Sequence, residues 1–98
     1  MEGVRFDGSL LILSDEVRSW TGMIETNGLD LVIAAGPGAV ELLILGMGKA
    51  LAPPPRSLRQ AVRDAGMGLE VMTTREAVRL YNLLASDGRR VAAALIAV

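Results

Sequence analysis

From residue 40 onward, the apolar residues alternate between continuous runs and runs with helical spacing. The segment Val40–Leu45 is apolar except at Glu41 and stops at a glycine-rich turn, which is typical of a buried strand. Three prolines at 53–55 disfavour a helix before them, and Pro55 can be the first residue of one. The next apolar stripe has the i, i+3, i+4, i+7 spacing of an amphipathic helix and comprises Leu58, Ala61, Val62 and Ala65. Gly66 then stands where a helix commonly ends.

The alternation of strand and helix continues to the end of the chain. Gly68–Met72 has a strand pattern, and the capping box from Thr73 to Glu76 opens a helix that runs to about Ser86. Val91–Val98 is an apolar run rich in alanine, which predicts a strand covered on both faces. Residues 40–98 are therefore predicted to form a parallel βαβαβ unit.

The N-terminal part has weaker patterns. Ser9–Leu13 and Val17–Trp20 predict a β-hairpin joined around residues 14–16. Leu29–Ala35 suits a short helix, but its valine and isoleucine also allow a strand, so the structure of residues 21–39 stays open. The fold predicted for residues 1–98 is a single three-layer α/β domain, with a central mixed sheet that contains the βαβαβ unit and the hairpin.

Composition excludes several kinds of site. The 98 residues are 51% hydrophobic and include no histidine, no cysteine and only three aromatic residues. A Ser-His-Asp triad, a thiolate nucleophile and a cysteine–histidine zinc site are therefore impossible within this chain. We predict no catalytic residue, no metal site and no cofactor, and a non-enzymatic role is favoured over an enzymatic one.

Charge is distributed unevenly along the chain. Residues 1–45 hold two basic and seven acidic residues, a balance of −5, whereas residues 46–98 hold eight basic and four acidic residues, a balance of +4. Two such halves attract each other within one domain or between copies, so a homo-oligomer is an open possibility. Basic residues are too sparse, and aromatic residues too few, for a nucleic-acid surface.

The longest apolar stretch is a poor membrane span. Leu31–Met47 contains Glu41, and a carboxylate at the bilayer centre costs roughly 2.5–3.5 kcal/mol. The Gly-Pro-Gly sequence at 36–38 also divides this stretch into two short elements. No transmembrane segment is predicted, and the acidic opening residues do not resemble a signal peptide, so a cytoplasmic protein is expected.

The loop Gly46-Met47-Gly48-Lys49 follows a predicted strand and invites comparison with phosphate-binding loops. A dinucleotide fingerprint needs a third glycine where Leu51 stands, and a Walker A loop needs Ser or Thr where Ala50 stands. A glycine turn that leaves a buried strand is therefore favoured. Ligands in open α/β sheets nevertheless bind beyond the carboxyl ends of strands, and the helix that begins at Thr73 and Thr74 starts there too. The crevice between them stays open as an anion or small-molecule site.

The helix after Thr73 adds polar candidates. Arg75 and Arg79 are four residues apart and repel each other unless an anion or an acidic partner neutralises them. Asn82 is a poor helix former in mid-helix, which suggests a role outside the helix, although a solvated surface explains all three residues as well. The candidate ligand or partner surface comprises Gly46, Met47, Gly48, Lys49, Thr73, Thr74, Arg75, Arg79 and Asn82.

Several motifs together resemble one protein family. They are LGMG at 45–48, PPPRSLRQAVR at 53–63, AGMGLEVMTT at 65–74, RLYNLL at 79–84 and GRRVAAAL at 88–95. This combination resembles the domain of unknown function shared by bacterial and archaeal proteins, the mitochondrial respiratory complex I assembly factor 3 and the adipogenesis-associated domain proteins. The chain departs from the family pattern at Met47, Thr73 and Val78, where the family often has Thr, Asp and Cys.

The resemblance implies a three-layer α/β fold without an established enzymatic activity. Its mitochondrial members help to assemble complex I by binding other proteins. We therefore expect a non-enzymatic accessory protein that binds other proteins and assists the assembly of a respiratory or membrane-associated complex. The alternative is a small-anion or small-molecule binding domain, with or without enzymatic activity, that uses the crevice between the Gly46–Lys49 loop and Thr73.

Overall fold

The sheet and its helices follow the order that the sequence patterns predict. The structure is a computed structural model that describes residues 8–13, 16–20, 29–49 and 53–97. Its elements are β1 (Ser9–Leu13), β2 (Glu16–Trp20), α1 (Asp30–Ala35), β3 (Leu42–Gly46), α2 (Arg56–Asp64), β4 (Gly68–Met72), α3 (Thr74–Ser86) and β5 (Val91–Leu95). The short segment Leu29–Ala35 is thus mainly helical. Glu16, predicted to lie in the hairpin turn, is instead the first residue of β2, and residues 14–15 lie outside the described residues.

The five strands form one mixed sheet in the order β2-β1-β5-β3-β4. β5, β3 and β4 are parallel, whereas β1 is antiparallel to both β2 and β5. Gly46 at the end of β3 is in register with Met72 of β4 and Leu95 of β5, so the carboxyl ends of these three strands meet at one end of the sheet. The predicted fold class is confirmed, including the parallel βαβαβ unit and the N-terminal hairpin.

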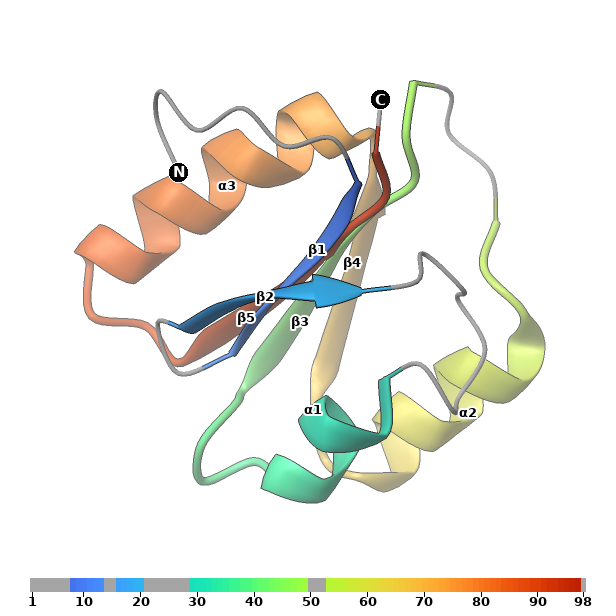
Figure 1. The fold of residues 1–98 in the computed structure, drawn as a ribbon. Helices are drawn as coiled ribbons and strands as arrows, with labels where there is room; N and C mark the ends of the chain where they lie inside the picture. Colours follow the sequence, from blue (N-terminus) through green and yellow to red (C-terminus); the bar gives the residue numbers. More distant parts are fainter. Residues whose placement is uncertain (1–7, 14–15, 21–28, 50–52, 98) are drawn as a thin grey trace.

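Helices cover both faces of the sheet, with α3 on one side and α1 and α2 on the other (Figure 1). β5 is buried along its whole length because Ala92 and Ala94 pack on the α1 and α2 side while Ala93 packs on the α3 side. Alanine lets the helices approach closely, as expected for a strand in the middle of a sheet. None of the described helices is long and apolar enough to cross a bilayer.

Most helix ends confirm the local sequence signals. Gly66 and Gly88 have φ values of 81° and 79° just after α2 and α3, where a left-handed residue suits glycine. Pro55 is the N-cap of α2, however, so α2 starts one residue later than predicted. β5 ends at Leu95, so Ile96 and Ala97, which were predicted to continue the strand, lie outside it. The main-chain N–H of Ile96 still donates to the carbonyl of Gly46, beyond the last paired residue of the strand.

Candidate functional site

The carboxyl ends of the parallel strands are tied together by Thr74, the first residue of α3. Thr74 is only 2% exposed. Its hydroxyl accepts a hydrogen bond from the N–H of Gly48 at 2.8 Å and donates one to the carbonyl of Ile96 at 2.6 Å. The N–H of Thr74 donates in turn to the carbonyl of Gly48 at 3.0 Å. One buried side chain therefore links the residues that follow β3 and β5 to the start of α3.

Gly46 lets α3 approach the sheet. A Cβ atom at this position would lie 2.8 Å from Cα of Thr74 and 3.1 Å from Cβ of Ala77, so the neighbouring atoms would have to move. Gly48 has a φ of 89°, a conformation that residues with side chains rarely adopt. Close packing and turn geometry thus explain both glycines of the loop, in agreement with the glycine turn favoured from the sequence.

At this end of the sheet, most of the main-chain N–H groups donate hydrogen bonds to acceptors within the protein. The N–H of Met47 donates to the carbonyl of Met72, and the N–H of Gly48 donates to Thr74. At the start of α3 the predicted capping box is present: the N–H of Glu76 donates to Thr73 Oγ1 at 3.3 Å, and the N–H of Thr73 donates to Glu76 Oε1 at 3.2 Å. Hydrogen bonds from Thr73 lower the pKa of Glu76, so a carboxylate already occupies the positive end of the helix.

Two cationic side chains lie beside this bonded core. A shallow hollow of about 290 Å³ is lined by Gly48, Lys49, Thr73 and Arg75. Within the described parts of the chain, neither cation forms an ion pair with a carboxylate. Lys49 and Arg75 come from segments that follow different strands, so the fold brings together charges that are 26 positions apart in the sequence.

The other predicted site residues do not line this hollow. Met47 is half-buried and packs against the core on the α1 and α2 side. Arg79 is exposed one turn further along α3, and Asn82 is half-buried beyond it. Of the predicted site residues, the structure therefore brings Gly48, Lys49, Thr73 and Arg75 together around one hollow, while Arg79 and Asn82 lie further along α3.

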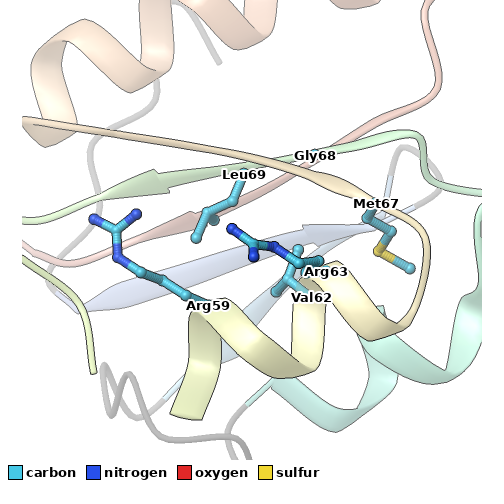
Figure 2. Close-up of a pocket in the computed structure, with 6 residues that line it drawn as sticks. All are labelled: Arg59, Val62, Arg63, Met67, Gly68 and Leu69. Carbon is cyan, nitrogen blue, oxygen red and sulfur yellow. The ribbon is translucent and has the colours of Figure 1, made fainter. Parts of the chain in front are cut away.

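A second hollow, of about 260 Å³, lies beside β4 and was not predicted from the sequence (Figure 2). Arg59 and Arg63 of α2 extend over it. Their i, i+4 spacing is visible in the sequence and places both arginines on one face of α2. Only the tertiary structure places that face beside an edge strand. The lining residues are Arg59, Val62, Arg63, Met67, Gly68 and Leu69.

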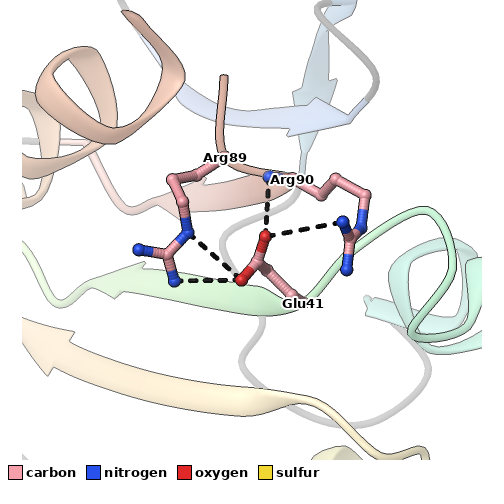
Figure 3. Close-up of polar contacts among 3 residues, drawn as sticks. All are labelled: Glu41, Arg89 and Arg90. Carbon is pink, nitrogen blue, oxygen red and sulfur yellow. Dashed lines mark hydrogen bonds and ion pairs between the residues drawn. The ribbon is translucent and has the colours of Figure 1, made fainter. Parts of the chain in front are cut away.

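An ion-pair cluster at the amino ends of β3 and β5 was also not predicted (Figure 3). Arg89 donates to Glu41 Oε1 from Nη2 at 2.9 Å and from Nε at 3.2 Å, and the N–H of Arg90 donates to Oε2 at 3.1 Å. These bonds, chiefly those from Arg89, lower the pKa of Glu41. The cluster joins two strands and has the geometry of a structural contact. Among the described residues, no group of three acidic side chains is arranged to hold a metal ion.

Comparisons with known proteins identify relatives along nearly the whole chain. An uncharacterised protein of Rhodobacter capsulatus is 40% identical over 89 residues, which cover 91% of this chain and 68% of the relative. A protein of Francisella tularensis named "13 kDa major membrane protein" is 29% identical over 82 residues, which cover 84% of this chain and 61% of that relative. The chain therefore spans less than two thirds of the Francisella protein.

Solved structures share the same fold. A protein of Rhodopseudomonas palustris is 39% identical with a TM-score of 0.83, and the match covers 100% of this chain and 75% of that one. An outer membrane protein of Bartonella henselae has a TM-score of 0.87 at 23% identity, covering 97% of this chain and 82% of that one, which shows the fold alone. Because some of these relatives are named as membrane proteins, the cytoplasmic location expected for this chain stays a prediction.

A family model also matches nearly the whole chain. A Bordetella pertussis structure described as a Mth938-like domain is similar at a TM-score of 0.74 and 24% identity, covering 97% of this chain and 77% of that one. The model for proteins of unknown function DUF498/DUF598 matches residues 1–96. The resemblance inferred from the glycine loop, the threonine pair and the alanine-rich strand is thereby confirmed: the chain belongs to the DUF498/DUF598 family of proteins of unknown function.

Proposed function

We propose that this protein is a non-enzymatic accessory protein that binds an acidic surface of another protein. The binding region is the α3 surface, which we define as the hollow of Gly48, Lys49, Thr73 and Arg75 together with Arg79 and Asn82. The observation that supports it most is that Lys49 and Arg75 line one hollow without an ion-pair partner in the described residues, whereas the main-chain N–H groups of Gly48, Thr73 and Thr74 already have acceptors.

The charges of the α3 surface suit a protein partner better than a single phosphate. A phosphate cradle uses several free main-chain N–H groups, and those of Met47, Gly48 and Glu76 already have acceptors. An acidic protein face instead needs only exposed cations, which speed association and define orientation. Each exposed ion pair contributes only about 0.2–1 kcal/mol, so several are required for a specific contact.

The partner class that we propose is a respiratory or membrane-associated complex under assembly. This step rests on the family resemblance, because the mitochondrial members of the family act on complex I. A second copy of this chain is the competing partner, since residues 1–45 are acidic and residues 46–98 are basic. Light scattering of the purified chain distinguishes the two: a monomer at micromolar concentration excludes a stable homo-oligomer.

Affinity capture from the organism that carries the gene tests the protein-binding proposal. The full chain serves as bait beside two variants with the same change of net charge, Arg75→Glu with Arg79→Glu on α3 and, as a control on exposed residues elsewhere, Arg18→Glu on β2 with Arg56→Glu on α2. We expect a defined protein to be retained by the wild type and by the control variant and to be lost with the α3 variant. Capture of no specific protein, or equal capture by all three baits, would contradict the α3 surface.

Small-anion binding is a second candidate function, because Lys49 and Arg75 line the same hollow. Thermal-shift measurements with phosphates, nucleotides and carboxylates test it. A ligand at one hundred times its dissociation constant stabilises the fold by about 2.7 kcal/mol, which a small domain reports clearly. We expect any such shift to disappear in Lys49→Ala and Arg75→Ala. The absence of a shift across the panel would leave protein binding as the remaining proposal.

A further inference from the structure

β4 is an edge strand whose outer side lacks a partner strand in the described sheet. On its inner side, the N–H of Gly68 donates to Glu41, and the carbonyl of Met72 accepts from Met47. Main-chain groups of alternate residues face opposite sides of a parallel strand. The N–H and carbonyl groups of Leu69 and Val71 therefore face the open edge, where a further strand can pair with them.

The second hollow, lined by Arg59 and Arg63 of α2 and called the α2 hollow below, lies directly beside this edge. Its apolar floor is formed by Val62, Met67 and Leu69, and the guanidinium groups of Arg59 and Arg63 extend from α2 toward β4 (Figure 2). Neither arginine forms an ion pair within the described residues, and the nearby carboxylate of Asp64 instead accepts a hydrogen bond from Gln60 at 2.8 Å. At about 260 Å³ the hollow is slightly below the roughly 300–1,000 Å³ typical of small-molecule sites, but it can hold parts of side chains.

The spacing of the two arginines matches that of alternate residues in a strand. Four residues of helix rise about 6 Å, which separates Arg59 from Arg63 along α2. Side chains on one face of a strand repeat about every 6.4–6.8 Å. Two acidic side chains at positions i and i+2 of an added strand could thus meet the two guanidinium groups, with their methylene groups over the partly exposed Leu69.

We propose that the open edge of β4, with Arg59 and Arg63 of α2, binds an extended acidic segment of a partner protein as an added strand. Main-chain pairing would supply affinity, and the arginines would select for carboxylates on the α2 side. Glu70 does not oppose this arrangement, because it is in register with Ile44 and faces the α3 side of the sheet. Pairing of β4 with β4 of a second copy is disfavoured, since it would bring the arginines of both copies to one seam.

This edge lies on different elements from the α3 surface, and the proposal does not rest on the proposed function. Heteronuclear NMR of the full chain tests it with a synthetic eight-residue peptide of alternating glutamate and threonine as the probe. We expect amide shifts and slowed hydrogen exchange at Leu69 and Val71. A peptide with lysine in place of glutamate should not bind. N-methylation of the alternate peptide residues whose N–H groups face β4 should also abolish binding.

Charge variants separate this edge from the α3 surface. Arg59→Glu with Arg63→Glu should weaken peptide binding by about tenfold or more, and Arg59→Gln with Arg63→Gln should weaken it less. Contacts of the acidic peptide with the α3 surface would appear as shifts around Lys49 and Arg75, so Arg75→Glu with Arg79→Glu should leave the shifts at Leu69 and Val71 unchanged. The spectra of all variants should confirm that the fold is retained. Three results would overturn the proposal: no shift at Leu69 and Val71 with millimolar peptide, shifts that persist in the α2 glutamate variant, or loss of binding only in the α3 variant.

Discussion

The N–H of Gly48 donates a hydrogen bond of 2.8 Å to the hydroxyl of Thr74, which lies 26 residues further along the chain. The same hydroxyl donates to the carbonyl of Ile96 at 2.6 Å, so both hydrogen bonds are made within the protein. Thr74 therefore has a structural role that the capping box alone does not reveal. Among the predicted site residues, Gly46 and Thr74 are engaged in packing and hydrogen bonds, so the proposed contact surface rests on the side chains of Lys49 and Arg75.

Removal of the Thr74 hydroxyl should destabilise the protein without changing its shape. Thr74→Val keeps the volume but leaves the N–H of Gly48 and the carbonyl of Ile96 without their buried partner. We expect a loss of about 1–3 kcal/mol in the free energy of unfolding, measured by urea denaturation. Thr74→Ser retains the hydroxyl and should lose less. Equal stability of the valine variant and the wild type would show that these bonds contribute little.

A single methyl group at Gly46 should be costly. Gly46→Ala places Cβ 2.8 Å from the backbone of Thr74, so α3 or β3 must shift. The expected destabilisation is about 2 kcal/mol or more, read from the urea midpoint. Gly38→Ala is the matched control because no heavy atom lies within 4 Å of the point its methyl group would occupy and its φ is not positive. Similar effects of both substitutions would contradict the close packing of α3 on Gly46.

The capping box should stabilise α3 through Thr73. Thr73→Ala removes the acceptor for the N–H of Glu76 and is expected to cost about 1 kcal/mol. Thr73→Asp supplies an acceptor for this N–H but loses the hydroxyl that donates to Glu76 Oε1 at 2.9 Å, so its stability should lie between those of the alanine variant and the wild type. Thermal unfolding monitored by circular dichroism compares the three proteins. If alanine and aspartate behaved alike, the side-chain cap would not be a source of stability.

Glu41 should make stability depend on pH. Because the hydrogen bonds from Arg89 lower the pKa of Glu41 below the ordinary value of a glutamate in the folded protein, the charged carboxylate favours folding. This contribution is complete above the pKa of the unfolded chain and is lost as the pH falls through the folded pKa. Urea midpoints of the wild type and Glu41→Gln should therefore differ at neutral pH and converge in acid. High salt should reduce the difference at neutral pH, and a difference that is constant with pH would exclude this cause.

Local sequence patterns determined most of the elements of this protein. The capping box at Thr73 and the left-handed glycines at 66 and 88 depend on neighbours within a few residues, so they can be recognised without the fold. The alanine-rich run at Val91–Leu95 likewise indicates burial on both faces. These signals were sufficient to predict the parallel βαβαβ unit. The observed strand ends differ from the predicted ones by a few residues, because strand pairing continues beyond an apolar run or stops short of its end.

Only the tertiary structure decided which distant residues meet. Glu41 contacts Arg89 across 48 positions, and Arg59 lies beside β4 because α2 packs there. Such pairs depend on the strand order and on which face of the sheet each helix covers. The periodicity of apolar residues along the chain gives no information about either. The close approach of Thr74 to Gly46 likewise follows from α3 packing across the end of β3. Short-range backbone preferences thus determine the elements, whereas long-range packing determines the candidate sites.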